Sequence, residues 1–487
     1  MPLISGENCP RPRKRALAFA IAHTQVAEMQ TARRVVIAAM LLLGLSPNLS
    51  FATVGGSGDL DPAFGNHGIA ELITQPQFFP FTPNMAFMGD GRIQVAVTGQ
   101  TAAGASAVAI ARLTGNGQID STYRSGQLGV LVPKQGSYVN ATAILPDGQV
   151  YALANSGTDT LLVGHVLASG AVDSQFGVGG WAAVGSSSLA NMSIVAAHVT
   201  KDGTILFCGT TTPSGQPQAF VGIFNPQDRS VVTATPLSMD LQTSSANTCT
   251  ESADGNLVLA GGAKRFSGVS NVDWFAARVT PALALDPTFN AAGIAPGILQ
   301  VSASLGINYD DYLESVVLDA TGAAYAGGNV LGAGQSEDFG FLKIGADGTP
   351  AVDFGFDANG VVALPIDAGT SKTEHLQAVA RQRSGKIVAA GYADEHISPL
   401  LKQLAVVRID SSGQLDAAFG TGAGRSIIPL STPGAPSAVY GTRVALALDV
   451  SDKPTVAVAY GDDFSSDSIK IFKFYEDQVF LGTFEPE

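Results

Sequence analysis

Short apolar runs alternate with polar turns along the chain from residue 55 onward, and no stretch there has the period of an amphipathic helix. Each unit begins with two runs that flank a short turn, which in most units is Asp-Gly. Asp-Gly between two such runs predicts a β-hairpin, because glycine accepts the positive φ of a tight turn. A third run, such as AVAIARL at 107–113, and a fourth, such as GVVALPI at 360–366, complete the unit. The seven signals are Asp90-Gly91, Asp147-Gly148, Asp202-Gly203, Asp254-Gly255, Thr321-Gly322, Ser384-Gly385 and the degenerate Ser451-Asp452.

A second landmark, of the form LDxxFGxxG, lies between the third and fourth runs. Its aspartates are 53 to 67 residues apart, apart from one double step that spans an eroded copy at 225–232. Repetition at a fixed period is typical of solenoids and propellers. The clear copies begin at Leu60, Ile119, Val172, Leu285, Val352 and Leu415.

Four short strands per unit are the content of one propeller blade. We therefore predict an all-β fold, a seven-bladed β-propeller of four-stranded antiparallel blades. The repeat region starts with a signature and its strand, 58–74, and ends with a hairpin and third strand, 443–474. Each end lacks what the other has, so the N-terminal strand should complete the last blade, close the ring and remove the free edges.

These motifs resemble the delta-60 repeat family, whose units of about 60 residues occur in bacterial, often exported, proteins. The resemblance covers nearly all of residues 55–475 and rests on the signature and its upstream hairpin. It implies a propeller-like fold and no assigned activity.

The stretch LDAAFGTGAG at 415–424 looks like a phosphate-binding loop. Such a loop opens a helix, whereas this stretch leads into SIIPL, a strand. We interpret it as a turn in which Leu415 and Phe419 pack between blades and Asp416 accepts backbone hydrogen bonds.

Residues 1–52 have the features of a secretory signal. An arginine pair precedes an apolar run at 35–45, and small residues end at Ala52. The run is too short for a stable membrane-spanning helix, which needs about 20 residues. We expect cleavage after Ala52, with Met29 as an alternative start, and one propeller domain over 53–487. Export would place the protein in the periplasm, at the cell surface or outside the cell.

The mature chain would be strongly acidic. It keeps 21 basic and 39 acidic residues, a formal charge of −18, and carries only 14% charged residues and many of the 56 glycines of the full sequence. No basic stripe is present, which argues against nucleic acid as a partner. Its two cysteines, Cys208 and Cys249, could pair in an oxidising compartment, and their spacing suits neither zinc nor redox motifs.

No catalytic or metal-binding motif is recognisable. The histidines are scattered, GxSxG is absent from the mature chain, and no acidic cluster has the alternating spacing of a preformed calcium site. We therefore predict no catalytic residues, no metal and no cofactor. We interpret the acidic clusters as solvated loops: Tyr309-Asp310-Asp311-Tyr312, Asp394-Glu395-His396, and Asp462-Asp463 with Asp467.

One register on the first strand of the blades is polar in four units. Seven residues before the hairpin signal stand Asn140, Asn247, Glu314 and Gln377. Blades 3 and 7 have Val195 and Val444 at this position and blade 1 has Pro83, with Asn84 and Arg443 one position away. If the first strands line the channel, the four polar side chains form an arc at a channel mouth, with Arg443 near Glu314. The alternative is a solvated strand end.

Two functions remain open. The first is an exported binding or scaffold module whose channel mouth or loops contact a protein, a glycan or a small polar ligand. The alternative is an extracytoplasmic hydrolase or lyase with a site at the channel mouth, which rests only on the fact that propellers host enzymes. The missing catalytic motifs favour binding.

Overall fold

A computed structural model describes most of the propeller region of the chain. Contacts divide the sequence into Met1–Val54 and Gly55–Glu487, and all described residues lie in the second unit. The predicted signal peptide lies outside them. The described residues are 56–74, 78–133, 136–156, 161–184, 192–213, 215–237, 241–264, 271–293, 295–303, 309–331, 336–355, 359–366, 373–395, 401–420, 423–430, 443–460 and 468–476.

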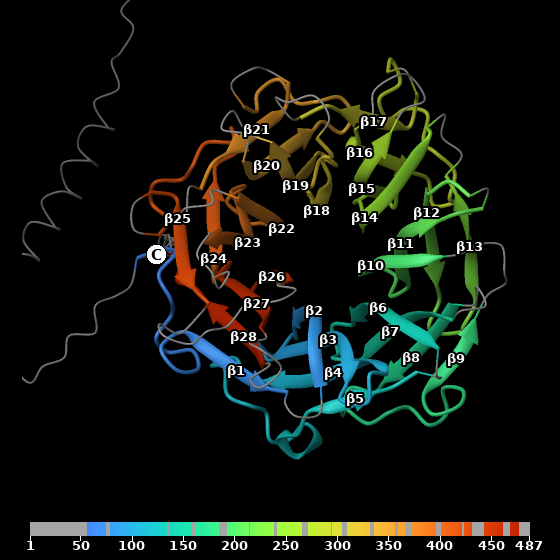
Figure 1. Cartoon of the computed structure of the whole chain (residues 1–487), viewed down its shortest axis with the longest axis vertical. Coiled ribbons are helices and arrows are strands. Elements are labelled where there is room, and N and C mark those ends of the chain that lie inside the picture. The colour runs from blue at the N-terminus through green and yellow to red at the C-terminus, as the bar shows by residue number, and fades with distance from the viewer. Residues whose placement is uncertain are drawn as a thin grey trace, which may run out of the picture. The chain divides into compact units, whose positions relative to one another are not determined.

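These residues form seven four-stranded antiparallel sheets around a ring, as predicted (Figure 1). The inner strands, one per blade, are β2 (Phe78–Phe87), β6 (Ser137–Ile144), β10 (Ser193–Val199), β14 (Thr243–Glu251), β18 (Leu313–Leu318), β22 (Thr373–Arg381) and β26 (Val444–Leu448). The second strands are β3 (Ile93–Thr101), β7 (Val150–Ser156), β11 (Ile205–Thr211), β15 (Leu257–Lys264), β19 (Ala324–Leu331), β23 (Ile387–Glu395) and β27 (Pro454–Tyr460).

The third strands are β4 (Ser106–Leu113), β8 (Leu161–Val166), β12 (Gln218–Phe224), β16 (Asp273–Val279), β20 (Glu337–Ile344), β24 (Leu401–Ile409) and β28 (Ser468–Lys473). The outer strands are β5 (Gly129–Leu131), β9 (Trp181–Val184), β13 (Val231–Pro236), β17 (Ile298–Val301), β21 (Val361–Leu364), β25 (Arg425–Pro429) and β1 (Ile69–Ile73). One 3-10 turn, η1 (Arg124–Gly126), is the sole helical element in the described part. No helix there is long and apolar enough to cross a membrane.

The N-terminal strand closes the ring, as predicted. β1 pairs antiparallel with β28, so the outer strand of blade 7 comes from the opposite end of the chain. Arg408 of blade 6 contacts residues near both ends of the propeller. Its guanidinium donates to Ser57 Oγ at 2.8 Å and forms an ion pair with the carboxylate of Glu476. Closure therefore combines a strand pairing with a buried ion pair.

The core lies between neighbouring blades. The cluster between blades 6 and 7 combines Val406 and Phe419 with Val456 and Phe472, whereas Leu415 packs on the opposite face of blade 6, against the cluster that it shares with blade 5. Both signature side chains thus pack between blades, as predicted.

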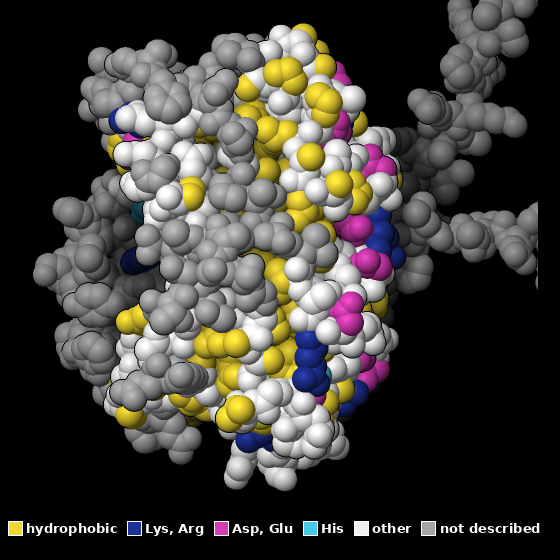
Figure 2. All heavy atoms as spheres, turned by 90° about the vertical axis from the view of Figure 1, so that its right-hand side faces the viewer, with side chains coloured by type: hydrophobic (Ala, Val, Ile, Leu, Met, Phe, Trp, Pro, Cys, Tyr) yellow, Lys and Arg dark blue, Asp and Glu magenta, His cyan; other side chains and the backbone are white. Residues whose placement is uncertain are grey.

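Acidic and basic side chains gather along one edge of the ring in Figure 2.

The aspartate of the signature forms an ion pair that recurs in several blades. Asp416 Oδ2 lies 2.7 Å from Arg408 Nε, and the guanidinium lies 4.9 Å from the ring centre of Phe419. Oδ1 of Asp416 accepts the N–H of Ala418 at 3.2 Å, which confirms its predicted role in the turn. Equivalent ion pairs in other blades are Arg112–Asp120, Arg278–Asp286 and Lys343–Asp353. In blade 2 a hydrogen bond between His165 and Asp173 takes this place, because burial lowers the pKa of the histidine.

Both cysteines are free and buried in the cluster between blades 3 and 4. Burial and contact with the Cys249 thiol raise the pKa of Cys208. The two side chains therefore meet, as their adjacent blades allowed, without a bond between them.

Candidate functional site

A cavity of about 430 Å³ lies in the channel, at the end of the ring where the inner strands begin; we call it the strand-start cavity. All five residues of the predicted site line it. They come from five blades: Asn140, Asn247, Glu314, Gln377 and Arg443. These residues can meet in one cavity because the inner strands that carry four of them surround the axis of the ring (Figure 1).

A β-bulge positions each of the four strand residues. The pairing of β6, β14, β18 and β22 with their second strands shifts at Asn140, Asn247, Glu314 and Gln377 respectively. The extra residue of a bulge has no cross-strand partner and its side chain is re-aimed. These positions can therefore be polar although their neighbours along the strand face the core.

Blade 1 departs from the predicted register, whereas blade 3 keeps it with an apolar residue. In blade 1 the bulge falls at Phe81, 45% exposed, instead of Pro83. The side chain of Asn84 donates to Thr142 O at 2.7 Å in blade 2 and so lies between blades. In blade 3, Val195 occupies the bulge and lines the cavity.

Blade 7 has no shift in its described pairing. Val444 pairs directly with Val458 and is buried. Arg443, just before β26, reaches the cavity instead with a side chain that is 54% exposed.

Glu314 is the electrostatic centre of the cavity. Asn247 Nδ2 donates to its Oε1 at 3.3 Å, and Arg443 Nη1 lies 3.7 Å from its Oε2. Burial raises the pKa of Glu314, against the opposing effects of Arg443 and the Asn247 amide. Both contacts are longer than an optimal charge-assisted hydrogen bond, so a ligand with better-placed groups can improve on them.

The remaining amides are anchored to neighbouring residues. Asn140 Nδ2 donates to Asn155 Oδ1 at 3.0 Å, and Asn155 in turn donates to Met192 O of blade 3. Gln377 Oε1 accepts the N–H of Val444 at 2.7 Å across the boundary between blades 6 and 7. The orientation of these side chains is therefore set by the protein before any ligand binds.

A second, smaller compartment of about 250 Å³ adjoins the first and shares Glu314, Gln377 and Arg443 with it. It adds Asn329, His375, Tyr392 and Lys402. The ring centres of His375 and Tyr392 lie 4.8 Å apart, and Lys402 Nζ lies 4.0 Å from the centre of the Tyr392 ring. Sequence reasoning missed this compartment, since its residues come from positions that are far apart in the repeat.

A carboxylate orients His375. Its Nδ1 lies 3.1 Å from Glu337 Oε2, and the hydroxyl of Tyr309 donates to the other oxygen of Glu337 at 2.5 Å. Burial and the hydrogen bond to Glu337 raise the pKa of Tyr309, so this tyrosine stays protonated. A carboxylate at Nδ1 favours the tautomer with the proton on that nitrogen.

The interpretation of the first acidic cluster as a solvated loop is wrong. Asp311 is fully buried, and Asp310 Oδ1 accepts the N–H of Val272 at 2.7 Å. The cluster fastens blade 5 to blade 4 because carboxylates satisfy otherwise unpaired backbone groups. Asp394 and Glu395 end β23, while His396, Asp462, Asp463 and Asp467 lie outside the described residues. Within those residues no three His, Cys, Asp or Glu side chains are grouped to hold a metal.

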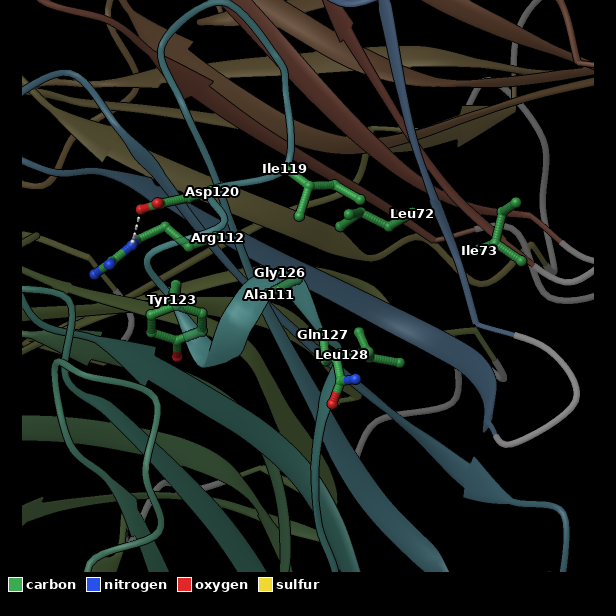
Figure 3. Close-up of a pocket in the computed structure, with 10 residues that line it drawn as sticks. All are labelled: Leu72, Ile73, Ala111, Arg112, Ile119, Asp120, Tyr123, Gly126, Gln127 and Leu128. Carbon is green, nitrogen blue, oxygen red and sulfur yellow. Dashed lines mark hydrogen bonds and ion pairs between the residues drawn. The ribbon is translucent and has the colours of Figure 1, made fainter.

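A small outer pocket of about 70 Å³ lies where blade 7 meets blade 1 (Figure 3). The Arg112–Asp120 pair and Tyr123 line one side, and Leu72 and Ile119 lie on the other. Its polar groups already pair with each other, so it belongs to the blade interface rather than to a binding site.

Comparison with known proteins agrees with this architecture. A family model described as a domain of unknown function (DUF5122) beta-propeller matches residues 89–123, from a hairpin signal through the next signature. The chain is a repeat-built β-propeller. A search of the curated proteins finds no match.

Several solved structures are similar to this chain at low sequence identity. They include a protein of unknown function from Dyadobacter fermentans, at 10% identity and TM-score 0.42, over 84% of this chain and 98% of that one. Another is the polysaccharide lyase Uly1, at 9% identity and TM-score 0.47, over 83% of this chain and 98% of that one. A third is a PQQ-bound aldose sugar dehydrogenase from Streptomyces coelicolor, at 12% identity and TM-score 0.36, over 69% of this chain and 94% of that one.

Proposed function

We propose that this protein is an exported β-propeller that binds a small polar ligand, such as the end of a glycan, in the strand-start cavity. One observation carries the proposal: polar side chains from five blades converge on a single cavity, four of them at bulges that free them from strand pairing. The cavity volume is within the range of small-molecule sites, about 300 to 1,000 Å³.

The chemistry of the lining suits hydroxyl groups. Asn140, Asn247 and Gln377 each carry a donor and an acceptor, Glu314 is an acceptor, and Arg443 is a donor. A sugar hydroxyl both donates and accepts, so it can satisfy either kind of group. Tyr392 adds an aromatic ring beside the polar groups in the adjoining compartment, and Arg443, shared by both compartments, would favour a ligand that also carries a carboxylate.

Export is part of the proposal and rests on the sequence of residues 33–52 and on the acidity of the mature chain. A strong negative charge keeps an exported protein soluble and away from anionic surfaces.

One observation favours the alternative of a hydrolase or lyase. His375, oriented by Glu337, lines the compartment that Arg443 also reaches. A histidine with a carboxylate at Nδ1 can act as a general base, and a nearby guanidinium can stabilise a developing anion. In that case turnover, and not only binding, should depend on His375.

The test is a glycan array with the mature protein, followed by calorimetric titration of the best glycan. Arg443→Met and Asn247→Ala should each weaken binding about tenfold or more, since each removes a polar contact inside the cavity. Arg383→Met is the matched control, because Arg383 is 70% exposed and pairs with Asp452.

Equal affinity in the site variants and the control would contradict this location. Release of new sugar ends by the wild type, lost in His375→Ala, would favour the enzyme. An array without any bound glycan would contradict a glycan as the ligand.

A further inference from the structure

The opposite end of the channel holds a cavity of its own. It has a volume of about 390 Å³ and shares no lining residue with the strand-start cavity. It lies where the inner strands end, toward the hairpins, and we call it the hairpin-end cavity. Its polar lining consists of His198, Thr200, Lys201, Thr250, Glu251 and Arg381.

Arg381 lines this cavity, and one donor of its guanidinium has no acceptor among the described residues. Its Nε atom is buried and has no hydrogen-bond partner within the described part of the chain. The guanidinium carbon lies 5.9 Å from the centre of the Tyr325 ring. Asp319, whose pKa Arg381 helps to lower, already binds Thr321 and the N–H of Ala323. A buried donor without an acceptor is costly, and native structures normally pair it with protein, water or ligand.

The other charges of the cavity leave a positive excess. Glu251 Oε2 accepts the backbone N–H of Lys201 at 2.7 Å, and Lys201 Nζ donates to Ser252 O at 2.7 Å. The cavity therefore carries two cations against one carboxylate. Burial lowers the pKa of His198, against the opposing charge of Glu251, so the imidazole is neutral at pH 7.

We propose that the hairpin-end cavity binds a small oxyanion, with Arg381 as its main ligand. The two terminal nitrogens of a guanidinium form a fork that fits two oxygens of a phosphate, sulfate or carboxylate. The apolar side chains of Val199, Val317 and Leu318 line the same cavity. They lower the local polarity, which strengthens the charge-assisted bonds. This site is independent of the proposed function at the strand-start cavity.

Calorimetric titration of the mature protein with inorganic phosphate, sulfate and acetate tests the proposal. Arg381→Met should weaken phosphate binding about tenfold or more, whereas Arg383→Met should bind as the wild type does. Sulfate binding alongside phosphate would identify a tetrahedral oxyanion site, and preference for acetate would identify a carboxylate site.

His198 provides an independent readout. A bound anion in the same cavity favours the imidazolium, so saturating phosphate should raise the pKa of His198 in NMR titrations of the wild type and not of Arg381→Met. If Arg381→Met does not fold, Arg381→Lys takes its place in the test. It keeps the charge and loses the fork, so its affinity for phosphate should lie between that of the wild type and the complete loss of binding. No detectable binding of any of the three anions, or equal binding by wild type and Arg381→Met, would overturn the proposal.

Discussion

Removal of residues 56–74 from the mature chain should open the ring and abolish its cooperative stability. This segment provides β1, which pairs residue by residue with β28 from Ile69–Phe472 to Ile73–Ser468. It also buries Phe64 at 1% exposure and Leu72 at 4%. The deletion would uncover the core of blade 7 and leave β28 as a free edge.

The magnitude follows from these side chains. Truncation of a buried phenylalanine costs about 3 to 5 kcal/mol and of a buried leucine about 2 to 5 kcal/mol. Each lost ladder hydrogen bond adds about 0.5 to 1.5 kcal/mol. The total approaches the entire net stability of a typical domain, about 5 to 15 kcal/mol. The shortened chain should therefore be unfolded or aggregated through the exposed edge of β28.

Guanidinium unfolding followed by circular dichroism, together with size-exclusion chromatography, measures this effect. Leu72→Ala and Ile73→Ala are a matched pair on the same strand, since Ile73 is 73% exposed and points away from the buried face (Figure 3). Leu72→Ala should lower the free energy of unfolding by about 2 to 5 kcal/mol, and Ile73→Ala by no more than about 0.5 kcal/mol. A synthetic peptide of residues 56–74 should restore a monomeric fold. An unchanged unfolding midpoint after the deletion would refute the closure.

Four further expectations concern other parts of the chain. Arg408→Met removes the cation paired with Glu476 and one of the two cations paired with Asp416, and should cost about 3 to 5 kcal/mol in urea unfolding. A smaller loss than that of Arg383→Met would speak against the network. Burial would raise the pKa of Asp416, but Lys386 and Arg408 outweigh it and hold the pKa low. Stability that such aspartates supply is present above their unfolded value, about 3.9, and is lost as the pH falls below it; a free energy of unfolding that stays flat from pH 5 to about pH 3 would contradict this. Alkylation in denaturant without reductant should modify both free cysteines. N-terminal sequencing of exported protein should begin at Thr53, and recovery of the arginine pair at 33–34 would exclude that cleavage.

Most of the fold could be predicted because each repeat unit carries its own local signals. Hairpin turns need a residue that tolerates positive φ, so Gly148 and Gly255, with φ of 87° and 85°, are visible in the sequence as Asp-Gly. Closure could be predicted because the missing pieces of the two chain ends are complementary. The buried ion pairs were missed, although Arg112, Arg278 and Arg408 all stand eight residues before their aspartate.

The site could be predicted only in part. Counting back from the hairpin finds Asn140, Asn247, Glu314 and Gln377, because the distance from turn to bulge is the same in these blades. The count fails in blade 1, where the bulge moves to Phe81, since nothing local in a sequence marks which residue of a strand loses its partner. The compartment around His375 combines residues of blade 6 with Glu314, Asn329 and Glu337 of blade 5. A single repeat unit does not encode contacts between blades.

The bulges separate what the ring recognises from what holds it together. A residue in cross-strand register contributes to the packing of its blade, whereas the side chains of the four polar bulged residues line the cavity. Val195 and Gln377 occupy equivalent places in blades of the same architecture, which shows that the scaffold tolerates side chains of opposite character there. Substitutions at this one position per blade can therefore change which side chains face the channel, while the strand pairing on either side of the bulge stays the same.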